Sequence, residues 1–318
     1  MTPAVGAPMG LRAGSNLEKV LAAGHFAVAV EMGPPKGTDI AFIRRKAEHL
    51  RGLADAVNVT DNQTAVVHMS SVAAASLLAG MGIEPVLQMV CRDRNRIGMQ
   101  SDLLGASALG IRNVLCIAGD HPSFGNQKSA RKVYDVDSIQ LVALVKRLRD
   151  EGKFLGCDDA VRGPMPMLIG AAENPFAVPC EFRALRLAKK VEAGADFIQT
   201  QSVFDVEMFR QWMQRVRDLG LDGRCSILAG VIPPKSLRMI EYMKNHVPGM
   251  LIPEAIVRRM AGVPADKAGD EGIRIACEII AEVREIRGVA GVHIMPIEWE
   301  HRVREIVECA GLLPRPVL

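Results

Sequence analysis

Short apolar segments typical of buried strands alternate with helical patterns along almost the whole chain, and this alternation limits the fold more than any other feature. The sequence predicts eight strands, at residues 25–35, 55–60, 85–91, 113–118, 164–172, 195–200, 225–230 and 291–297. Helical patterns with apolar positions three or four residues apart separate most of these strands. Eight strands that alternate with helices are what a (β/α)8 barrel requires.

A doubly wound parallel sheet is the alternative architecture for such a chain. The first predicted strand runs into Gly33-Pro34-Pro35 and not into a G-x-G-x-x-G turn, which favours the barrel. Polar residues also stand at the ends of most strands, namely Glu31, Thr60, Gln88, Asp120, Glu173 and Gln201. Because the strand ends of a barrel face one mouth, the α/β fold that we expect, a (β/α)8 TIM barrel, brings these side chains together.

Composition narrows the classes of function. The 318 residues are 49% hydrophobic but contain no run of about 20 apolar residues, so we expect a large core and no membrane span. A net charge of +3 with 4% aromatic residues argues against nucleic-acid binding. The seven cysteines form no C-x-x-C pair, which indicates a reduced, cytoplasmic protein. We expect a flexible N-terminal arm at residues 1–15 and a single catalytic domain at residues 16–318.

Two of the strand ends carry carboxylates. Glu31 precedes GPPK, and Asp120 follows Gly119, whose missing side chain lets a flat ligand lie close to the backbone. One buried carboxyl group can stay neutral and donate a proton while the other stays ionised and stabilises a cation. Such a pair suits reactions in which charge develops on a nitrogen heterocycle. A solvated strand end for Glu31 and a loop cap for Asp120 are the competing interpretations.

Nucleophilic and metal chemistry have no specific support in the sequence. No Ser or Cys lies in a nucleophile-elbow motif, and no pair of histidines has metal-ligand spacing, so we expect no metal. The run CRDRNR at residues 91–96 is typical of a solvated turn with internal salt bridges. His293 is interpreted as a loop or core histidine.

Several segments together resemble a known family. VAVEMGPPKG, DAVNVTDN, QMVCRDRNR, GIRNVLCIAGDHP and GADFIQTQSVFD occur in the order and spacing of the methylenetetrahydrofolate reductases. The resemblance covers residues 27–312. The C-terminal segment GVHIMPIEWE is similar to the short branch that consists of the catalytic domain alone and often works beside partner proteins. The resemblance implies a (β/α)8 flavoprotein, an oxidoreductase of one-carbon metabolism that reduces 5,10-methylenetetrahydrofolate to 5-methyltetrahydrofolate.

The resemblance also implies roles for single residues. Glu31 falls on the family's general acid, and Asp120 on the carboxylate that stabilises the iminium cation. Folate contacts are implied for Glu31, Asp120 and Gln201. Cofactor contacts are implied for Thr60, Gln88, Ala118, Gly119, Asp120, Tyr134, Arg183 and Lys190. Lys190 falls on the lysine that meets the flavin phosphate, although ordinary solvation on a helix surface explains it almost equally well.

Departures from the better-known branch leave the cofactor open. Gln88 replaces a histidine, and Arg183 replaces an aspartate near the cofactor's ribose. FAD is the expected cofactor, and FMN is the alternative because an extra arginine suits a terminal phosphate. The reductant is NAD(P)H or electrons supplied by a partner protein. The alternative functions are a flavin-independent NAD(P)H reductase of the same fold and a folate-binding reductase subunit that receives electrons through a partner protein. Electron-transfer or methyltransferase proteins are the expected partners. The sequence leaves a homo-oligomer open.

Overall fold

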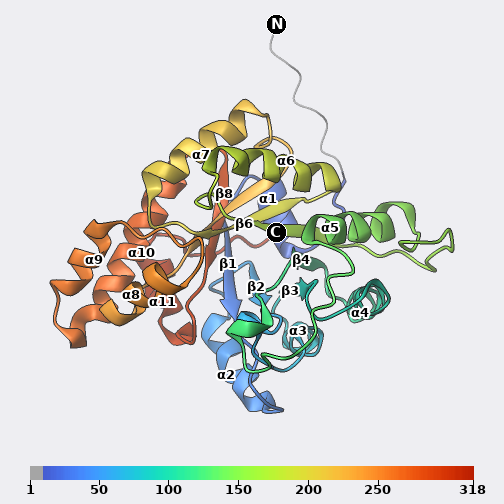
Figure 1. Cartoon of the computed structure of the whole chain (residues 1–318), viewed down its shortest axis with the longest axis horizontal. Helices are drawn as coiled ribbons and strands as arrows, with labels where there is room; N and C mark the ends of the chain where they lie inside the picture. Colours follow the sequence, from blue (N-terminus) through green and yellow to red (C-terminus); the bar gives the residue numbers. More distant parts are fainter. Residues whose placement is uncertain (1–9) are drawn as a thin grey trace, which may run out of the picture.

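A closed barrel of eight parallel strands forms the centre of the computed structural model, which describes residues 10–318 (Figure 1). Each strand pairs with the next one in the sequence, and the last pairs with the first. The predicted (β/α)8 barrel is therefore confirmed. The strands are β1 (Ala27–Met32), β2 (Ala56–Val59), β3 (Pro85–Val90), β4 (Asn113–Ile117), β5 (Leu168–Glu173), β6 (Phe197–Ser202), β7 (Ser226–Val231) and β8 (Val289–Ile294).

Helices surround the barrel, and those of the C-terminal part gather on one side of it (Figure 1). Asp39 caps the second helix, where its side chain accepts a hydrogen bond from the backbone of Ala41. Gly110 and Gly194 follow two further helices with φ angles of +84° and +118°, which favour glycine. The helices are α1 (Asn16–Ala22), α2 (Ile40–Leu50), α3 (Ser71–Gly80), α4 (Arg96–Ala108), α5 (Ser138–Lys146), α6 (Arg183–Ala193), α7 (Val206–Asp218), α8 (Leu237–His246), α9 (Glu254–Ala261), α10 (Ala268–Arg284) and α11 (Val303–Cys309).

Helix α3 was not among the expected elements. Its sequence, SVAAASLLAG, is apolar on nearly all sides and lacks the polar face by which an amphipathic helix is identified. The helix packs against β3 and against its neighbours α2 and α4. Small alanine side chains suit this close packing, so tertiary contacts rather than a helical pattern explain the element.

The core has two layers, one inside the barrel and one between the strands and the helices. The inner layer contains small and aliphatic side chains from most of the strands, together with Phe197 of β6. Leu17 and Val20 of α1 belong to this inner layer, so α1 closes one end of the barrel. The outer layer is much larger and joins the strands to the surrounding helices. The filled inner layer leaves the opposite end of the barrel for a site.

A buried ion pair joins the C-terminal segment to the closed end of the barrel. Arg315 contacts Asp55, with 2.5 Å between Nη2 and Oδ2, and donates to the carbonyl groups of Phe26 and Leu312 at 2.8 Å. Asp55 also accepts from the backbone N–H of Val28 at 2.7 Å. The Asp55 side chain is fully buried, so its charge depends on Arg315 for compensation.

Arg315→Ala is expected to destabilise the fold without changing the site. Removing one partner of a buried ion pair leaves the other charge uncompensated, which costs about 3 kcal/mol of unfolding free energy. Urea denaturation of the variant measures this loss. The kcat/KM of the folded variant should equal that of the parent, since the ion pair lies at the closed end of the barrel, away from the C-terminal ends of the strands. A variant as stable as the parent would show that solvent compensates Asp55.

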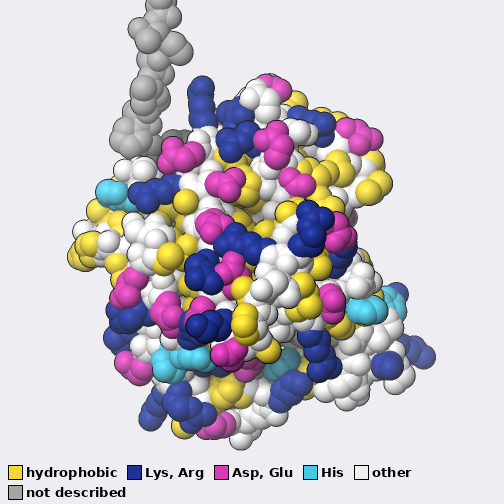
Figure 2. Space-filling model, turned by 90° about the vertical axis from the view of Figure 1, so that its left-hand side faces the viewer, with side chains coloured by type: hydrophobic (Ala, Val, Ile, Leu, Met, Phe, Trp, Pro, Cys, Tyr) yellow, Lys and Arg dark blue, Asp and Glu magenta, His cyan; other side chains and the backbone are white. Residues whose placement is uncertain are grey.

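The Glu18 side chain holds the residues that precede α1. Glu18 accepts hydrogen bonds from the backbone of Arg12, Ala13 and Gly14, while residues 1–9 of the predicted arm lie outside the described residues. The division at residue 15 stays a prediction. No helix between residues 10 and 318 is long and apolar enough to cross a membrane. Charges of both signs intermingle on the face in Figure 2, in line with the net charge of +3.

Candidate active site

A cavity of about 410 Å³ lies at the C-terminal ends of the strands. Parallel barrels direct the last side chains of their strands toward this mouth, and the size is that of a small-molecule site. The predicted site residues that line it are Glu31, Gln88, Ala118, Gly119, Asp120, Arg183, Lys190 and Gln201. Glu173, also predicted at a strand end, lines it as well. Side chains from distant parts of the sequence therefore share one cavity.

Glu31 lies near the end of β1 with only 9% of its surface exposed. Burial raises the pKa of its carboxyl group to about 7. Hydrogen bonds from Gln88 at 3.3 Å and Gln63 at 3.1 Å oppose this rise in pKa, and the nearby charge of Glu300 adds slightly to it. At neutral pH about half of such carboxyl groups carry a proton. Glu31 is therefore not a solvated strand end but a carboxyl group able to donate a proton.

Asp120 lies three residues after the end of β4. Gly119 adopts a φ of +84°, and a side chain there would meet Val90 at 3.0 Å. Glycine is thus required both by the backbone angle and by the close approach of β3. The carboxylate of Asp120 accepts a hydrogen bond from the backbone N–H of Thr64 at 3.0 Å. Thr64 itself has a φ of +54°, so the β2 loop bends unusually to reach Asp120.

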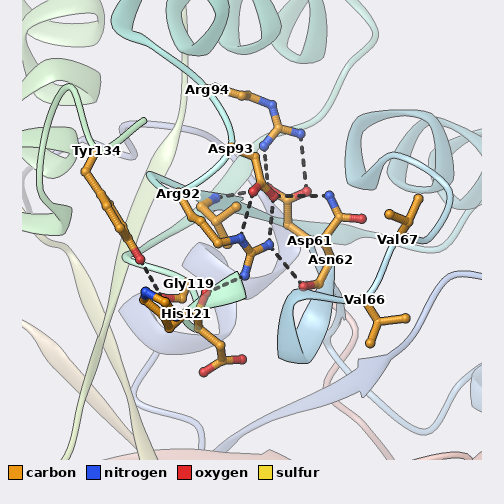
Figure 3. A network of polar contacts seen from close by, with 12 residues as sticks. Asp61, Asn62, Val66, Val67, Arg92, Asp93, Arg94, Gly119, His121 and Tyr134 are labelled. Carbon is orange, nitrogen blue, oxygen red and sulfur yellow. Dashed lines mark hydrogen bonds and ion pairs between the residues drawn. The ribbon is translucent and has the colours of Figure 1, made fainter. Parts of the chain in front are cut away.

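A buried arginine joins the loops that follow β2, β3 and β4 (Figure 3). The Arg92 side chain is 3% exposed and donates to the carbonyl groups of Asp120 at 2.9 Å and Asn62 at 3.1 Å. It also forms a two-bond ion pair with Asp93, with both distances at 2.7 Å. The rigid fork of a guanidinium group suits this set of acceptors. Arg92 thereby fixes the backbone of Asp120.

The expectation of a solvated CRDRNR turn is therefore wrong in part. The Arg92–Asp93 pair within the run exists, but Arg94 reaches out of it to the buried Asp61 at 2.6 Å and to Asp102 at 2.8 Å. The sequence alone suggested neither contact, because one partner lies in another loop and the other lies nearly two turns into α4. The charged run is therefore buried at the mouth, where its arginines hold the neighbouring loops together; we call the contacts of Arg92 the clamp.

Arg92→Lys should lower both the stability of the fold and the affinity of the site for its ligand. A lysine keeps the charge but cannot bind Asp93, Asp120 and Asn62 at once, so buried carbonyl groups lose partners at a cost of about 2 kcal/mol. Thermal denaturation measures the first effect. If Arg92 fixes Asp120, the affinity for the ligand that contacts Asp120 falls as well, and Arg304→Lys on exposed α11 serves as the control. Unchanged stability and affinity would show that the clamp is dispensable.

Lys190 is a buried residue of α6 and not a free surface cation. Its ammonium group binds Glu173 at 2.6 Å and the carbonyl oxygen of Ala172, and burial lowers its pKa. Arg183 lines the same wall and donates to the carbonyl groups of Ala177 and Val178 at 2.7 Å. Arg186, one turn further along α6, also lines the cavity and was missed by sequence reasoning. Among the described residues, this wall therefore carries the three basic side chains of Arg183, Arg186 and Lys190 beside the carboxylate of Glu173.

Two predicted cofactor residues do not line the cavity among the described residues. Thr60 follows β2 with 2% of its surface exposed, and its hydroxyl lies beside Gly33. Tyr134 donates through its hydroxyl to the carbonyl of Gly119 at 3.3 Å, so it lies behind the turn that holds Asp120 (Figure 3). Gln201 does face the cavity, where its side chain accepts from the backbone of Ser202.

The arrangement separates charges across the mouth. A protonatable carboxyl group lies on the β1 side, a carboxylate follows β4, and basic groups cover the α6 wall. Such a cavity can donate a proton, stabilise a cation and hold an anionic group of the same bound assembly. His293 of β8 also lines the cavity and was missed as a site residue.

Sequence comparisons agree on one family. A family model described as methylenetetrahydrofolate reductase matches residues 16–311. A probable methylenetetrahydrofolate reductase (NADPH) of Caenorhabditis elegans is 24% identical over 77% of this chain and 35% of the worm protein. Methylenetetrahydrofolate reductase (NADH) 1 of Zea mays is 26% identical over 93% of this chain and 51% of the maize protein. The matches thus span about a third to a half of these relatives' length.

Comparisons of structure support the barrel. A Clostridium thermocellum protein, described as binding two copies of 5-methyl-5,6,7,8-tetrahydrofolic acid, superposes with a TM-score of 0.64 at 13% identity. The superposition covers 93% of this chain and all of that protein. A 2,3-dimethylmalate lyase reaches a TM-score of 0.50 at 13% identity, over 95% of this chain and 88% of the lyase. At such low identity these likenesses concern the fold alone.

Proposed function

The chain belongs to the methylenetetrahydrofolate reductase family, and from this we propose that it reduces 5,10-methylenetetrahydrofolate to 5-methyltetrahydrofolate with the help of a bound flavin. The observation that carries the proposal is Glu31, a buried carboxyl group with a pKa of about 7 inside the barrel mouth. A reductase of this substrate needs a proton donor at neutral pH, because the imidazolidine ring opens only when a ring nitrogen is protonated.

Glu31 acts as the general acid in this proposal. It transfers its proton to N10 of the folate as the bond between N10 and the bridging carbon breaks, which leaves a cationic 5-iminium group. The amide groups of Gln63 and Gln88 hold the Glu31 carboxyl group in place through the two hydrogen bonds. Burial raises the fraction of Glu31 that carries a proton at neutral pH.

Asp120 stabilises the iminium cation through its negative charge. Thr64 orients one carboxylate oxygen, and Arg92 fixes the backbone, so the charge needs little reorganisation during the reaction. Gln201 lines the same cavity and is assigned to hydrogen bonding with the folate ring. These assignments agree with the family resemblance and with the shared cavity.

The residues present fit a flavin. Its phosphate matches the guanidinium groups of Arg183 and Arg186, which form stronger and more directional contacts with phosphate than neutral donors do. We assign the phosphate to these arginines, with Lys190 in support, because Glu173 already holds the Lys190 ammonium group. Gly119, Ala118 and Gln88 would contact the rest of the cofactor, with Tyr134 and Thr60 acting from behind the lining. A bound, reduced flavin supplies the hydride that converts the iminium carbon to a methyl group.

Relatives are named for NADH or NADPH, so we propose a nicotinamide as the reductant of this chain as well. Steady-state kinetics test this point. A flavin that is reduced and reoxidised in one site gives ping-pong behaviour, whereas direct transfer from the nicotinamide to the folate gives sequential behaviour. If an artificial one-electron donor reduces the protein but neither NADH nor NADPH does, the nicotinamide proposal fails. The chain would then be a subunit that receives its electrons from a partner protein.

The decisive experiment is an absorbance spectrum of the purified chain, followed by chromatography of any released cofactor. We expect FAD or FMN, and oxidation of the reduced protein by 5,10-methylenetetrahydrofolate. A colourless protein that takes up neither flavin but reduces the folate with a nicotinamide would overturn the flavin assignment and leave the reductase intact. Failure to reduce the folate with any electron donor would overturn the proposed function itself.

A further inference from the structure

His293 is a buried polar residue of the barrel, and one atom of its side chain has no partner. It belongs to β8, lines the cavity and is 4% exposed. Its Nε2 atom is enclosed and forms no hydrogen bond with the described residues. Asn58 and Gln199 satisfy each other with two hydrogen bonds at 2.6 and 3.0 Å, whereas the Oδ1 atom of Asn113 at the start of β4 also lacks a partner. Among the described residues that line the cavity, His293 is the one with such an atom.

An enclosed nitrogen without a partner is costly, so native proteins rarely retain one unless a bound molecule satisfies it. Burial also lowers the pKa of His293 to about 3. The imidazole is therefore neutral at the pH of any ordinary assay and can both donate and accept a hydrogen bond. It is unsuited to acid–base chemistry and suited to the recognition of a polar, uncharged ring.

The position of His293 indicates which ring it meets. In the barrel, His293 pairs with Ala29 of β1, and Glu31 lies two residues further toward the mouth on the same face of that strand. The atom that Glu31 protonates belongs to the folate. The predicted flavin contacts, by contrast, come mainly from β3, from the segment after β4 and from α6. His293 is therefore on the folate side of the cavity.

We propose that the imidazole of His293 hydrogen-bonds the pterin ring of the bound folate and holds it in register with Glu31. The inference rests on the proposed function, whose substrate it specifies further. His293 is a substrate-binding residue in this account, and the bound ring supplies the partner that its side chain lacks. The interpretation as a plain core histidine predicts no contact with any ligand.

His293→Leu tests the proposal because leucine fills a similar volume without polar atoms. We expect a 10- to 100-fold loss in kcat/KM for 5,10-methylenetetrahydrofolate and a matching loss of affinity for 5-methyltetrahydrofolate, measured by calorimetry. His293→Gln should recover part of both losses, since an amide can again donate and accept. The melting temperature of His293→Leu should equal or exceed that of the parent, because an unsatisfied polar group has been removed.

Trp212→Phe is the matched control. Trp212 of α7 also carries a buried nitrogen without a partner among the described residues, but it packs in the outer layer of the core and not in the cavity. Its replacement should leave folate affinity unchanged. Equal folate affinity of parent and His293→Leu would overturn the proposal, as would a loss confined to flavin retention.

The binding measurement also separates this inference from the proposed function. If the parent binds 5-methyltetrahydrofolate but does not reduce its precursor, the reductase assignment fails while His293 is still tested by affinity. If the parent binds no folate at all, both fail together. If the parent binds and His293→Leu binds equally well, the inference about His293 alone fails.

Discussion

Glu31→Gln should lower the rate of folate reduction by about 100- to 10,000-fold, the range typical of a lost general acid. Glutamine has nearly the same shape, and its one oxygen can still accept from Gln63 or from Gln88, so the cavity is retained. The amide has no acidic proton to transfer. Single-turnover oxidation of the reduced protein by 5,10-methylenetetrahydrofolate measures this step. Reduction of the protein by the nicotinamide should proceed at the parent rate, because that step needs no proton from Glu31.

The pH dependence gives the same variant a second signature. Glu31 must be protonated to act, so the rate of the folate step in the parent should fall as the pH rises above about 7. Glu31→Gln should lose this dependence. Glu48→Gln on the exposed side of α2 is the control and should keep the parent profile. A full folate rate in Glu31→Gln at any pH would contradict the assignment of the general acid.

Glu31→Gln should raise the stability of the fold although it lowers the catalytic rate. The folded-state pKa of about 7 lies above the ordinary glutamate value of 4.5, so ionisation of Glu31 opposes folding. The associated stability is complete below about pH 4.5 and is lost as the pH rises through about 7. Above that range Glu31→Gln should be more stable than the parent by up to about 3 kcal/mol. Urea denaturation at pH 5 and pH 8 measures the difference, which must grow with pH.

Asp120→Asn should lower the folate step by about 100- to 1,000-fold. The amide keeps the shape and an oxygen that can accept from Thr64, but it removes the negative charge that faces the cation. Single-turnover kinetics should show the loss mainly in the rate at saturating folate. Binding of 5-methyltetrahydrofolate should change much less, because the pterin ring of this product carries no iminium charge.

Two controls make the Asp120 result specific. Asp158→Asn changes a carboxylate that is 91% exposed, so it should leave both rate and affinity unchanged. The melting temperature of Asp120→Asn should also lie within a few degrees of that of the parent, since Arg92 binds the backbone carbonyl of Asp120 and not its side chain. Equal losses of product affinity and rate would indicate that Asp120 binds the folate without favouring the cation.

The two carboxyl groups could be predicted from the sequence because their positions depend on local patterns. An apolar strand followed by glycine and proline residues locates a strand end, and eight such ends in a barrel share one mouth. Gly119 and Asp120 belong to such a pattern, and so does Glu31 before GPPK. Residue types and spacing were therefore enough to predict the barrel, and six strand-end side chains of which all but Thr60 line the cavity.

The surroundings of these groups could not be predicted in the same way. The Glu173 partner of Lys190 belongs to β5, and Arg92 contacts the loops after β2 and β4. The sequence therefore could not reveal the ion pair that buries Lys190 or the contacts that bury the charged turn. Helix α3 was missed because its side chains are apolar all round, and Thr60 is buried with its hydroxyl beside Gly33 instead of lining the cavity. These surroundings depend on which elements meet in the closed barrel, and local sequence patterns do not contain that information.

The sequence by itself determined the alternation of strands and helices, the residues at the strand ends and, through its motifs, the family. These features follow from the local periodicity of apolar residues and from the turn chemistry of glycine and proline. Only the tertiary structure decided that Glu31 has a pKa of about 7, that Arg92 is a clamp and that His293 lacks a partner. Burial and partner choice are set by side chains brought together from across the barrel, because desolvation depends on everything that surrounds a group.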